Sequence, residues 1–290
     1  MTERVHRAGV VALLGKPNVG KSTLLNRLLG CKLAIVTTKP QTTRSRILGI
    51  LTLEDAQVLL LDTPGMHAGA KAMNLALNEI ADEVAEGCDV ALLLVDLTRG
   101  WSDDAAALAS RLADGGKPLL VVGTKSDLAG ADAPKWPEEA PQPQRVCART
   151  GAGIDALLER MLALLPESPP LYPEDELSDS PMRFLAGELV REAAFDALEQ
   201  ELPYSLAVEV LEYDEKCPDL VRIRANLLVE RASQKQIVIG RDGQVVKKIG
   251  IRARREIEKL VGGKVHLELW VKVEPKWSKR PSRLKSLGYT

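Results

Sequence analysis

The residues with the clearest chemistry lie near the beginning of the chain. Gly15, Gly20, Lys21 and Ser22 match the pattern G-x-x-x-x-G-K-[ST], between an apolar run and a leucine-rich stretch. The glycines let the backbone curl so that its N–H groups converge on phosphate oxygens, and the lysine reaches the β- and γ-phosphates. The serine hydroxyl is a ligand for Mg²⁺. The pattern predicts a nucleotide-phosphate loop between a strand and a helix.

A second segment, LLLDTPG, ends an apolar run in an acid. Asp62 is placed to hold Mg²⁺ through a water, and the backbone N–H of Gly65 is placed to meet the γ-phosphate. The pattern D-x-x-G alone is usually just a turn. Its interpretation as a metal and phosphate contact depends on the phosphate loop upstream.

Two later segments predict which base the nucleotide carries. In TKSD, Thr124, Lys125 and Asp127 follow an apolar run, and the aspartate is placed to accept the N1–H and the N2 amine of guanine. Adenine has neither donor there, so a buried aspartate would be left unpaired. In VCARTGAG, the backbone N–H of Ala148 is placed to face the guanine O6. The order and spacing of these segments favour guanine.

These segments need a scaffold that gathers strand ends at one edge. The apolar runs at 10–14, 58–61, 90–95 and 119–122 are short and partly β-branched, as buried parallel strands are. Segments with helical spacing separate them, for example around Leu75, Ile80 and Val84. The alternation predicts an α/β domain whose mostly parallel sheet has helices on both faces. A last helix is expected over 155–165.

Composition and charge define the rest of the organisation. Residues 166–181 hold five prolines and five acids, which predicts an extended linker. We expect a first domain over 1–168, a linker over 169–181, a second domain over 182–276 and a basic tail over 277–290. Net charge is −1 overall, but residues 231–290 carry 16 basic and 5 acidic side chains. Such a block is either a solvated charged face or a footprint for phosphates.

The composition also indicates where the chain works. It is 45% hydrophobic and 27% charged, which is typical of a soluble globular protein. Its 4 cysteines form no CxxC pair, and no stretch approaches the roughly 20 apolar residues of a membrane span. With no signal-peptide pattern at the N-terminus, we expect a reduced, cytosolic chain that at most visits a membrane surface.

The second half of the chain predicts an α+β domain. Helical spacing over 182–198 precedes two strand-like segments, and a strictly alternating strand over 264–273 ends the unit. Between them, G-x-x-G at Gly240 to Gly243 joins an aliphatic segment to a basic helix that ends at Gly262. This order resembles the type II KH domain, whose G-x-x-G loop clamps about four single-stranded nucleotides. The alternative is a structural turn beside a solvated basic helix.

The RNA-contacting candidates cluster at this loop. They are Ile239, Gly240, Arg241, Asp242, Gly243, Lys247 and Lys248. Trp277 in the basic tail either stacks on a base or anchors the tail on its own domain. The polar composition of the tail is also compatible with disorder.

The motifs GKPNVGKS, QTTRSR, DTPGMH, TKSD and CARTGAG follow the order seen in translation-factor-like GTPases. Over nearly its whole length the chain resembles the Era family of bacterial ribosome-assembly GTPases. The resemblance implies a P-loop GTPase domain followed by a type II KH domain, with GTP or GDP and Mg²⁺ as cofactors. It implies that Thr42 or Thr43, with Thr43 preferred, completes the Mg²⁺ shell beside Ser22 and Asp62. Asn18 matches a loop asparagine that some relatives use to hold K⁺.

The nucleotide-binding candidates can now be given together. They are Gly15, Asn18, Val19, Gly20, Lys21, Ser22, Thr23, Asp62, Thr124, Lys125, Asp127, Cys147, Ala148 and Arg149. Two of them depart from the family pattern, because Thr124 replaces an asparagine and Cys147 replaces a serine. The first change removes a side-chain amide contact, while the discriminating Asp127 remains. We expect guanine specificity to survive both changes.

Hydrolysis should be slow without a partner. Where Ras-type enzymes carry a glutamine that orients the attacking water, this chain has Met66, whose thioether cannot orient water through a hydrogen bond. The neighbouring His67 is either a surface loop residue or a base. Charge stabilisation by Lys21, Mg²⁺ and backbone N–H groups should provide most of the rate, with Lys21, Thr43 and Gly65 as the catalytic candidates.

The resemblance implies a GTP-hydrolysing switch that binds the single-stranded 3′ end of 16S ribosomal RNA and assists assembly of the 30S subunit. It implies a cytoplasmic monomer and leaves peripheral association with the inner face of the membrane open. Two alternatives remain at this stage. One is a GTPase of tRNA modification or signalling whose C-terminal module does not bind RNA. The other is a non-enzymatic RNA chaperone with a purely structural nucleotide domain.

Overall fold

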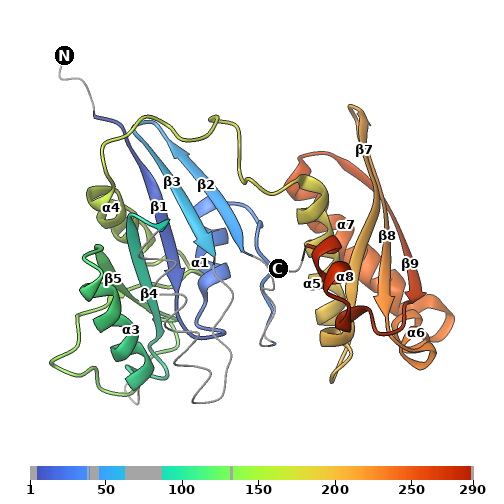
Figure 1. Ribbon diagram of the computed structural model, residues 1–290, viewed down its shortest axis with the longest axis horizontal. Helices are drawn as coiled ribbons and strands as arrows, with labels where there is room; N and C mark the ends of the chain where they lie inside the picture. The colour runs from blue at the N-terminus through green and yellow to red at the C-terminus, as the bar shows by residue number, and fades with distance from the viewer. Residues whose placement is uncertain (1–4, 38, 40–45, 63–86, 131–132, 289–290) are drawn as a thin grey trace. The chain divides into compact units, whose positions relative to one another are not determined.

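The computed structural model describes residues 5–37, 39, 46–62, 87–130 and 133–288. Its contacts divide the chain into two compact units (Figure 1). Unit 1 comprises Met1–Gly30 and Arg46–Asp179, and unit 2 comprises Cys31–Ser45 and Ser180–Thr290. The predicted linker over 169–181 spans this division, and most of its residues belong to unit 1.

Unit 1 is built on a six-stranded sheet in the order β2-β3-β1-β4-β5-β6. The strands are β1 (Arg7–Leu14), β2 (Ile47–Leu53), β3 (Ala56–Asp62), β4 (Val90–Asp96), β5 (Leu119–Thr124) and β6 (Gln144–Arg145). Neighbouring strands are parallel except for β2 and β3, which form an antiparallel pair. The predicted mostly parallel sheet is therefore confirmed, and it gains an antiparallel edge strand that the apolar runs did not predict.

The central strands of this sheet are buried on both faces. The helices described in unit 1 are α1 (Lys21–Leu29), α3 (Asp103–Asp114) and α4 (Ile154–Leu164). Helix α3 packs on Leu14 of β1 and on Leu93 and Val95 of β4, in one apolar cluster. The intervening Leu92 and Leu94 are buried as well, which requires cover on the opposite face. The helical pattern predicted around residues 75–84 lies outside the described residues.

The proline-rich linker follows the antiparallel edge of this sheet. The side chain of Gln57 in β3 is fully buried, and its Oε1 accepts the backbone N–H groups of Leu171 and Tyr172. Farther along, the Ser178 hydroxyl donates to the carbonyl of Leu48 at 2.6 Å. An extended segment without its own core is thus held by hydrogen bonds to β2 and β3.

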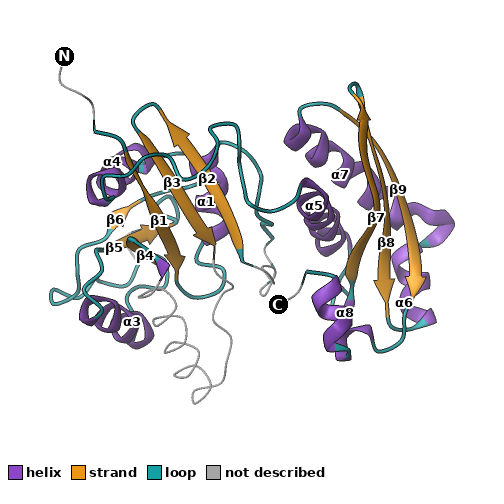
Figure 2. Cartoon of the chain, turned by 45° about the horizontal axis from the view of Figure 1, so that its top comes forward, coloured by secondary structure: helices purple, strands orange, loops and turns teal. Residues whose placement is uncertain are grey.

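Unit 2 has the predicted order of helix, two strands, helix, G-x-x-G, helix and strand (Figure 2). Its main elements are α5 (Met182–Ala197), β7 (Ala207–Cys217), β8 (Leu220–Val229), α6 (Ala232–Ile239), α7 (Gln244–Val261) and β9 (Lys264–Val273). The sheet order is β7-β8-β9, with β7 antiparallel and β9 parallel to β8. Short 3₁₀ turns lie at Pro203–Ser205, Arg241–Gly243 and Trp277–Lys279, and α8 spans Pro281–Ser286.

One face of this three-stranded sheet forms the core of unit 2. Helix α7 buries Ile249, Ala253 and Ile257, spaced four residues apart along one stripe, against the sheet and the neighbouring helices. Alternate residues of β9, beginning at Val265, face the same cluster. The predicted apolar face of the basic helix and the predicted alternation of the last strand are both present.

The C-terminal tail covers part of the opposite sheet face. Trp277 is 1% exposed and packs with Ala207, Leu228 and Leu287. Ala207 and Leu228 alternate with residues of the core face, so this cluster lies on the other side of the sheet. Its burial means that the indole of Trp277 is not available to stack on a base. Of the two alternatives predicted for Trp277, the structure shows that it anchors the tail on its own domain. The prediction that it stacks on a base is wrong for this conformation.

Over the described ranges, no helix combines the length and the apolar character that crossing a bilayer requires.

The packing of Trp277 leads to a stability prediction with a control on the same sheet. Trp277→Ala should lower the free energy of unfolding of unit 2 by about 3–5 kcal/mol, because it removes a fully buried ring and leaves a cavity. Trp270→Ala is the matched control, since Trp270 is 64% exposed. Urea unfolding of the full chain measures both. Equal losses for the two variants would contradict the assignment of Trp277 as the anchor.

Candidate functional site

The phosphate-binding loop connects β1 to α1 in unit 1. Gly15 has a φ of 140° and Gly20 a φ of 105°, in the region that favours glycine, and Asn18 also has a positive φ. A Cβ on Gly15 would lie 2.6 Å from the carbonyl oxygen of Leu94, so the first glycine is required by close packing as well. Gly20 caps the N-terminus of α1 without a side-chain hydrogen bond. This end of α1 has the loop geometry and helix dipole of an anion site.

Lys21 begins α1 and is buried under the loop. Its Nζ donates to the carbonyls of Gly15 at 3.0 Å and Lys16 at 3.2 Å. Burial lowers the pKa of Lys21, and the negative charge of Asp62 opposes this effect. The ammonium is therefore enclosed among loop oxygens, within the segment that is predicted to surround the phosphates.

Ser22 and Asp62 meet at the ends of α1 and β3. The Ser22 hydroxyl donates to Oδ2 of Asp62 at 2.6 Å. Burial raises the pKa of Asp62, although Lys21 and the hydrogen bond from Ser22 counteract the rise. The other oxygen, Oδ1, is buried and has no hydrogen-bond partner among the described residues.

These two side chains fit a Mg²⁺ site. Mg²⁺ prefers oxygen ligands, and an orphaned buried carboxylate oxygen beside a hydroxyl offers them. Bound there with GTP, the ion would neutralise negative charge on the phosphates. Thr43, Thr42 and Gly65, together with Met66 and His67, lie outside the described residues, and their roles stay predictions.

Thr124 ties the base-recognition segment to the phosphate loop. It is buried at the end of β5, and its hydroxyl lies 2.6 Å from the carbonyl of Val19 and 3.2 Å from that of Val95. The hydroxyl thus bonds to the phosphate loop from the position where the family pattern has an asparagine. Thr124 thus links the predicted base-recognition segment to the phosphate loop through a hydrogen bond.

Asp127 is held by both of its carboxylate oxygens. The Cys147 thiol donates to Oδ1 at 3.0 Å, and Arg149 donates to Oδ2 at 2.7 Å. These hydrogen bonds, with that of Cys147 the larger, lower the pKa of Asp127. The sulfur of Cys147 also accepts the N–H of Thr150 at 3.4 Å. Cys147 therefore orients the aspartate that is predicted to read guanine, and the half-buried Ala148 follows it.

Lys125 makes a contact that the sequence analysis did not predict. Its Nζ lies 2.7 Å from Oδ2 of Asp96 at the end of β4. In the sequence, Asp96 follows directly after the apolar run over 90–95, which marks it as an acid at a strand end. The sequence does not show that the strand before Lys125 lies beside this one.

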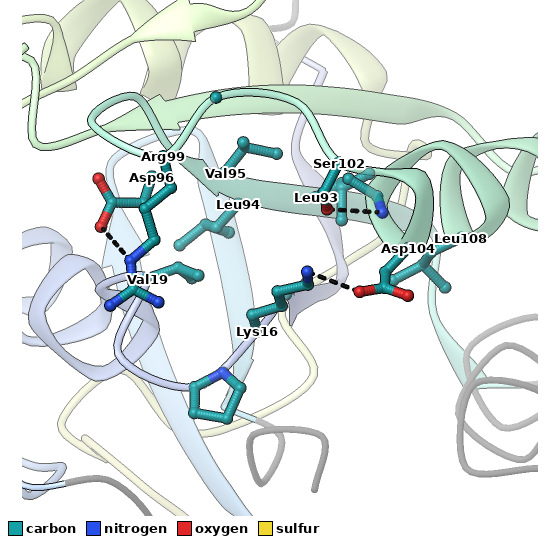
Figure 3. Close-up of a pocket in the computed structure, with 14 residues that line it drawn as sticks. Lys16, Val19, Leu93, Leu94, Val95, Asp96, Arg99, Ser102, Asp104 and Leu108 are labelled. Carbon is teal, nitrogen blue, oxygen red and sulfur yellow. Dashed lines mark hydrogen bonds and ion pairs between the residues drawn. The ribbon is translucent and has the colours of Figure 1, made fainter. Parts of the chain in front are cut away.

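A cavity of about 160 Å³ lies beside the phosphate loop (Figure 3). Its walls come from the loop, the end of β4 and helix α3, and Lys16 bridges one side of it to Asp104 at 2.6 Å. Among the described residues, Lys21 and Ser22 do not line it. The cavity is thus adjacent to the predicted phosphate site and is not that site itself.

The G-x-x-G loop of unit 2 lies between α6 and α7. Gly240 and Gly243 have φ values of 72° and 75°, and Asp242 also has a positive φ. A Cβ on Gly240 would lie 2.4 Å from Cγ2 of Val245, so glycine is required there for packing as well as for conformation. The Arg241 side chain is 92% exposed at the tip of the loop.

The basic residues predicted to contact RNA are exposed at the start of α7. Lys247 and Lys248 are both exposed, and Ile239 is half-buried at the end of α6. Gly243 forms the N-cap of α7 without a side-chain hydrogen bond. The arrangement combines a tight glycine loop, a helix N-terminus and positive charge, as binding to a phosphate backbone requires.

A groove that the sequence analysis did not predict adjoins this loop. It has a volume of about 350 Å³ and runs between α7 and β9. Its lining includes Ile251, Leu267 and Leu269, with the cations Lys247 and Arg254. An apolar groove with cations beside it suits bases whose phosphates lie along its edge. The alternation of β9 predicted its leucines as core residues and did not indicate that they also line a groove.

Comparisons with known proteins agree with both units. The model of the 50S ribosome-binding GTPase family matches residues 10–125, and the KH domain model matches residues 201–278. GTPase Era of Stenotrophomonas maltophilia strain R551-3 is 44% identical over 98% of both chains. GTPase Era of Geotalea uraniireducens is 41% identical over 100% of both chains.

Two crystal structures of Era proteins also match nearly the whole chain. One is Era in complex with MgGDPNP and nucleotides 1506–1542 of 16S ribosomal RNA, with 38% identity, a TM-score of 0.85 and coverage of 98% of this chain and 99% of that chain. The other is a variant of Aquifex aeolicus Era bound to GDP and AlF₄⁻, with 38% identity, a TM-score of 0.84 and the same coverage. The predictions of a P-loop GTPase domain, a KH domain and a GTP- and Mg²⁺-dependent enzyme are confirmed. This chain belongs to the GTPase Era family.

Proposed function

We propose that this protein is a GTP-hydrolysing switch that binds the single-stranded 3′ end of 16S ribosomal RNA and assists assembly of the 30S subunit. The observation that carries the proposal is the pairing, in one chain, of the Ser22–Asp62 site with an exposed basic G-x-x-G loop. Support comes from a relative, matched end to end, that was crystallised with MgGDPNP and nucleotides 1506–1542 of that RNA.

The residues of unit 1 divide the work of nucleotide binding. The backbone of the loop from Gly15 to Gly20 surrounds the phosphates, and Lys21 supplies positive charge to the β- and γ-phosphates. Ser22 and Asp62, with Thr43, would hold Mg²⁺, and the ion would supply charge neutralisation at the phosphates. Electrostatic stabilisation therefore provides most of the rate.

The base is recognised by a fixed carboxylate. Asp127 accepts the N1–H and N2 amine of guanine through lone pairs that its bonds to Cys147 and Arg149 leave available. Because both oxygens are already oriented, the carboxylate loses little freedom when guanine binds.

Unit 2 binds the phosphate backbone of the RNA at one place and recognises the bases of the RNA at another. Arg241, Lys247 and Lys248 neutralise phosphates near the G-x-x-G loop, which fixes the register of the strand. The groove between α7 and β9 receives the bases. We place the protein in the cytoplasm as a monomer, and we include peripheral association with the inner face of the membrane in the proposal.

Exchange of the base-reading carboxylate tests the nucleotide assignment. Asp127→Asn should weaken GTP binding at least about 100-fold, because the amide N–H₂ opposes the N2 amine of guanine. The same variant should prefer xanthosine triphosphate, whose C2 carbonyl accepts from that amide. Titration with fluorescent nucleotides measures both affinities, and Asp114→Asn, an exposed aspartate on α3, is the control. A variant that still prefers GTP would refute the assignment of Asp127.

Charge reversal at the loop tests the RNA assignment. Replacing Arg241, Lys247 and Lys248 by Glu in the full chain should weaken binding to a 16S 3′-end oligonucleotide at least tenfold. Each phosphate contact with a single strand contributes about 0.7 to the slope of log affinity against log salt, so this slope should fall by about 2. Fluorescence anisotropy at several salt concentrations measures both quantities.

The control for this experiment carries the same change in charge elsewhere in unit 2. Lys276, Lys279 and Lys285 are exposed in the tail, and their reversal to Glu should cost less affinity than reversal at the loop. A scrambled oligonucleotide measures the sequence-independent part of binding. If loop reversal left binding unchanged, or if both reversals acted equally, unit 2 would not read RNA through its G-x-x-G loop.

A further inference from the structure

A buried aspartate at the end of β4 holds the lysine of the base-recognition segment. Asp96 is 4% exposed, and strand register places it beside Thr124 of β5. Its Oδ2 lies 2.7 Å from Nζ of Lys125. The Arg99 guanidinium is 4.0 Å away on an exposed side chain, so Lys125 is the closer cation.

The two oxygens of Asp96 have separate tasks. Oδ1 accepts the backbone N–H of Thr98 at 3.0 Å and its hydroxyl at 2.7 Å, which stabilises the turn after β4. Oδ2 faces Lys125. Burial favours the neutral acid, but the hydrogen bonds from Lys125 and Thr98 outweigh it, so the pKa of Asp96 lies below its usual value. The carboxylate is therefore charged at neutral pH and attracts the ammonium.

Lys125 lies in the middle of the predicted base-recognition segment, between Thr124 and Asp127. It adopts a φ of 55°, a conformation that costs free energy for a residue with a Cβ. Thr124, before it, is bonded to Val19 of the phosphate loop, and Asp127 follows two residues later. Without a partner for its ammonium, the Lys125 side chain would be free to rotate. The strained backbone between Thr124 and Asp127 would then lose the contact that holds it in place.

We propose that Asp96 is a positioning residue for guanine-nucleotide binding, which acts by holding the Lys125 ammonium and thereby fixing the segment from Thr124 to Asp127. This inference rests on the proposed function of unit 1. In this role Asp96 acts through Lys125 and not directly on the nucleotide. Its removal affects nucleotide affinity, and chemistry at the phosphates continues at the same rate once the nucleotide is bound.

The substitution Asp96→Asn separates the two tasks of the side chain. The amide oxygen keeps the bonds to Thr98, while the amide N–H₂ faces the Lys125 ammonium and cannot attract it. We expect GDP and GTP to bind about tenfold more weakly, with KM raised to match and kcat at saturating GTP unchanged. Thr98→Val is the control, because it removes a bond to Oδ1 and leaves the contact with Lys125 in place. It should lower thermal stability without changing GDP affinity.

A double-mutant cycle decides between positioning and a general structural role. If Asp96 acts through Lys125, then Asp96→Asn combined with Lys125→Met should bind GDP no more weakly than Lys125→Met alone. Additive losses, or GDP affinity of Asp96→Asn equal to that of the parent protein, would overturn the proposal. If the parent protein itself fails to bind GDP, the proposed function of unit 1 fails instead.

A second comparison covers the case in which Asp96→Asn does not fold. With Asp96 kept, Lys125→Arg retains a cation opposite the carboxylate, and Lys125→Met does not. The arginine variant should lose less GDP affinity than the methionine variant. Equal losses would show that the charge contact with Asp96 contributes nothing to nucleotide binding, and would overturn the proposal.

Discussion

Unit 1 depends on charged groups that are buried where its parallel strands end. A charge removed from water is costly unless other groups compensate it. Lys21 after β1, Asp62 at the end of β3 and Asp96 at the end of β4 are all buried. The charge of Asp62 is compensated in part by Lys21 and Ser22, and that of Asp96 by Lys125 after β5. Because each partner comes from a different strand, the order β3-β1-β4-β5 brings these charges together and fixes the nucleotide site at one edge of the sheet.

Unit 2 avoids the cost of burying charge, because the cations of its G-x-x-G loop are exposed to solvent. Its loop cations, Arg241, Lys247 and Lys248, remain in water, so each stays charged at little cost. The backbone of the loop lies so close to Val245 that a Cβ on Gly240 would not fit. A loop with solvated charge suits a polyanion, whose own phosphates supply the countercharge and release bound ions. A small ligand such as a nucleotide instead benefits from the buried, oriented charges of unit 1.

The parts that the sequence predicted are those with local causes. The spacing of Gly20, Lys21 and Ser22 specifies a turn and a helix start within a few residues, so it can be interpreted without a fold. Asp96 could not be assigned, because its role depends on β4 lying beside β5. Trp277 was ambiguous for a related reason. Its burial depends on the tail folding back over Leu228, a residue 49 positions earlier in the sequence.

The two residues that depart from the family pattern, Thr124 and Cys147, both make hydrogen bonds in the predicted nucleotide site. The Thr124 hydroxyl links the end of β5 to the phosphate loop by donating a hydrogen bond to the carbonyl of Val19. The Cys147 thiol donates one of the two hydrogen bonds that orient the carboxylate of Asp127, and Arg149 donates the other. Discrimination of guanine is more demanding, because two adjacent donors on the base need two acceptors held in one plane. Of Thr124, Asp127 and Cys147, only Asp127 presents two acceptors in one plane, so the predicted discrimination of guanine depends on its carboxylate.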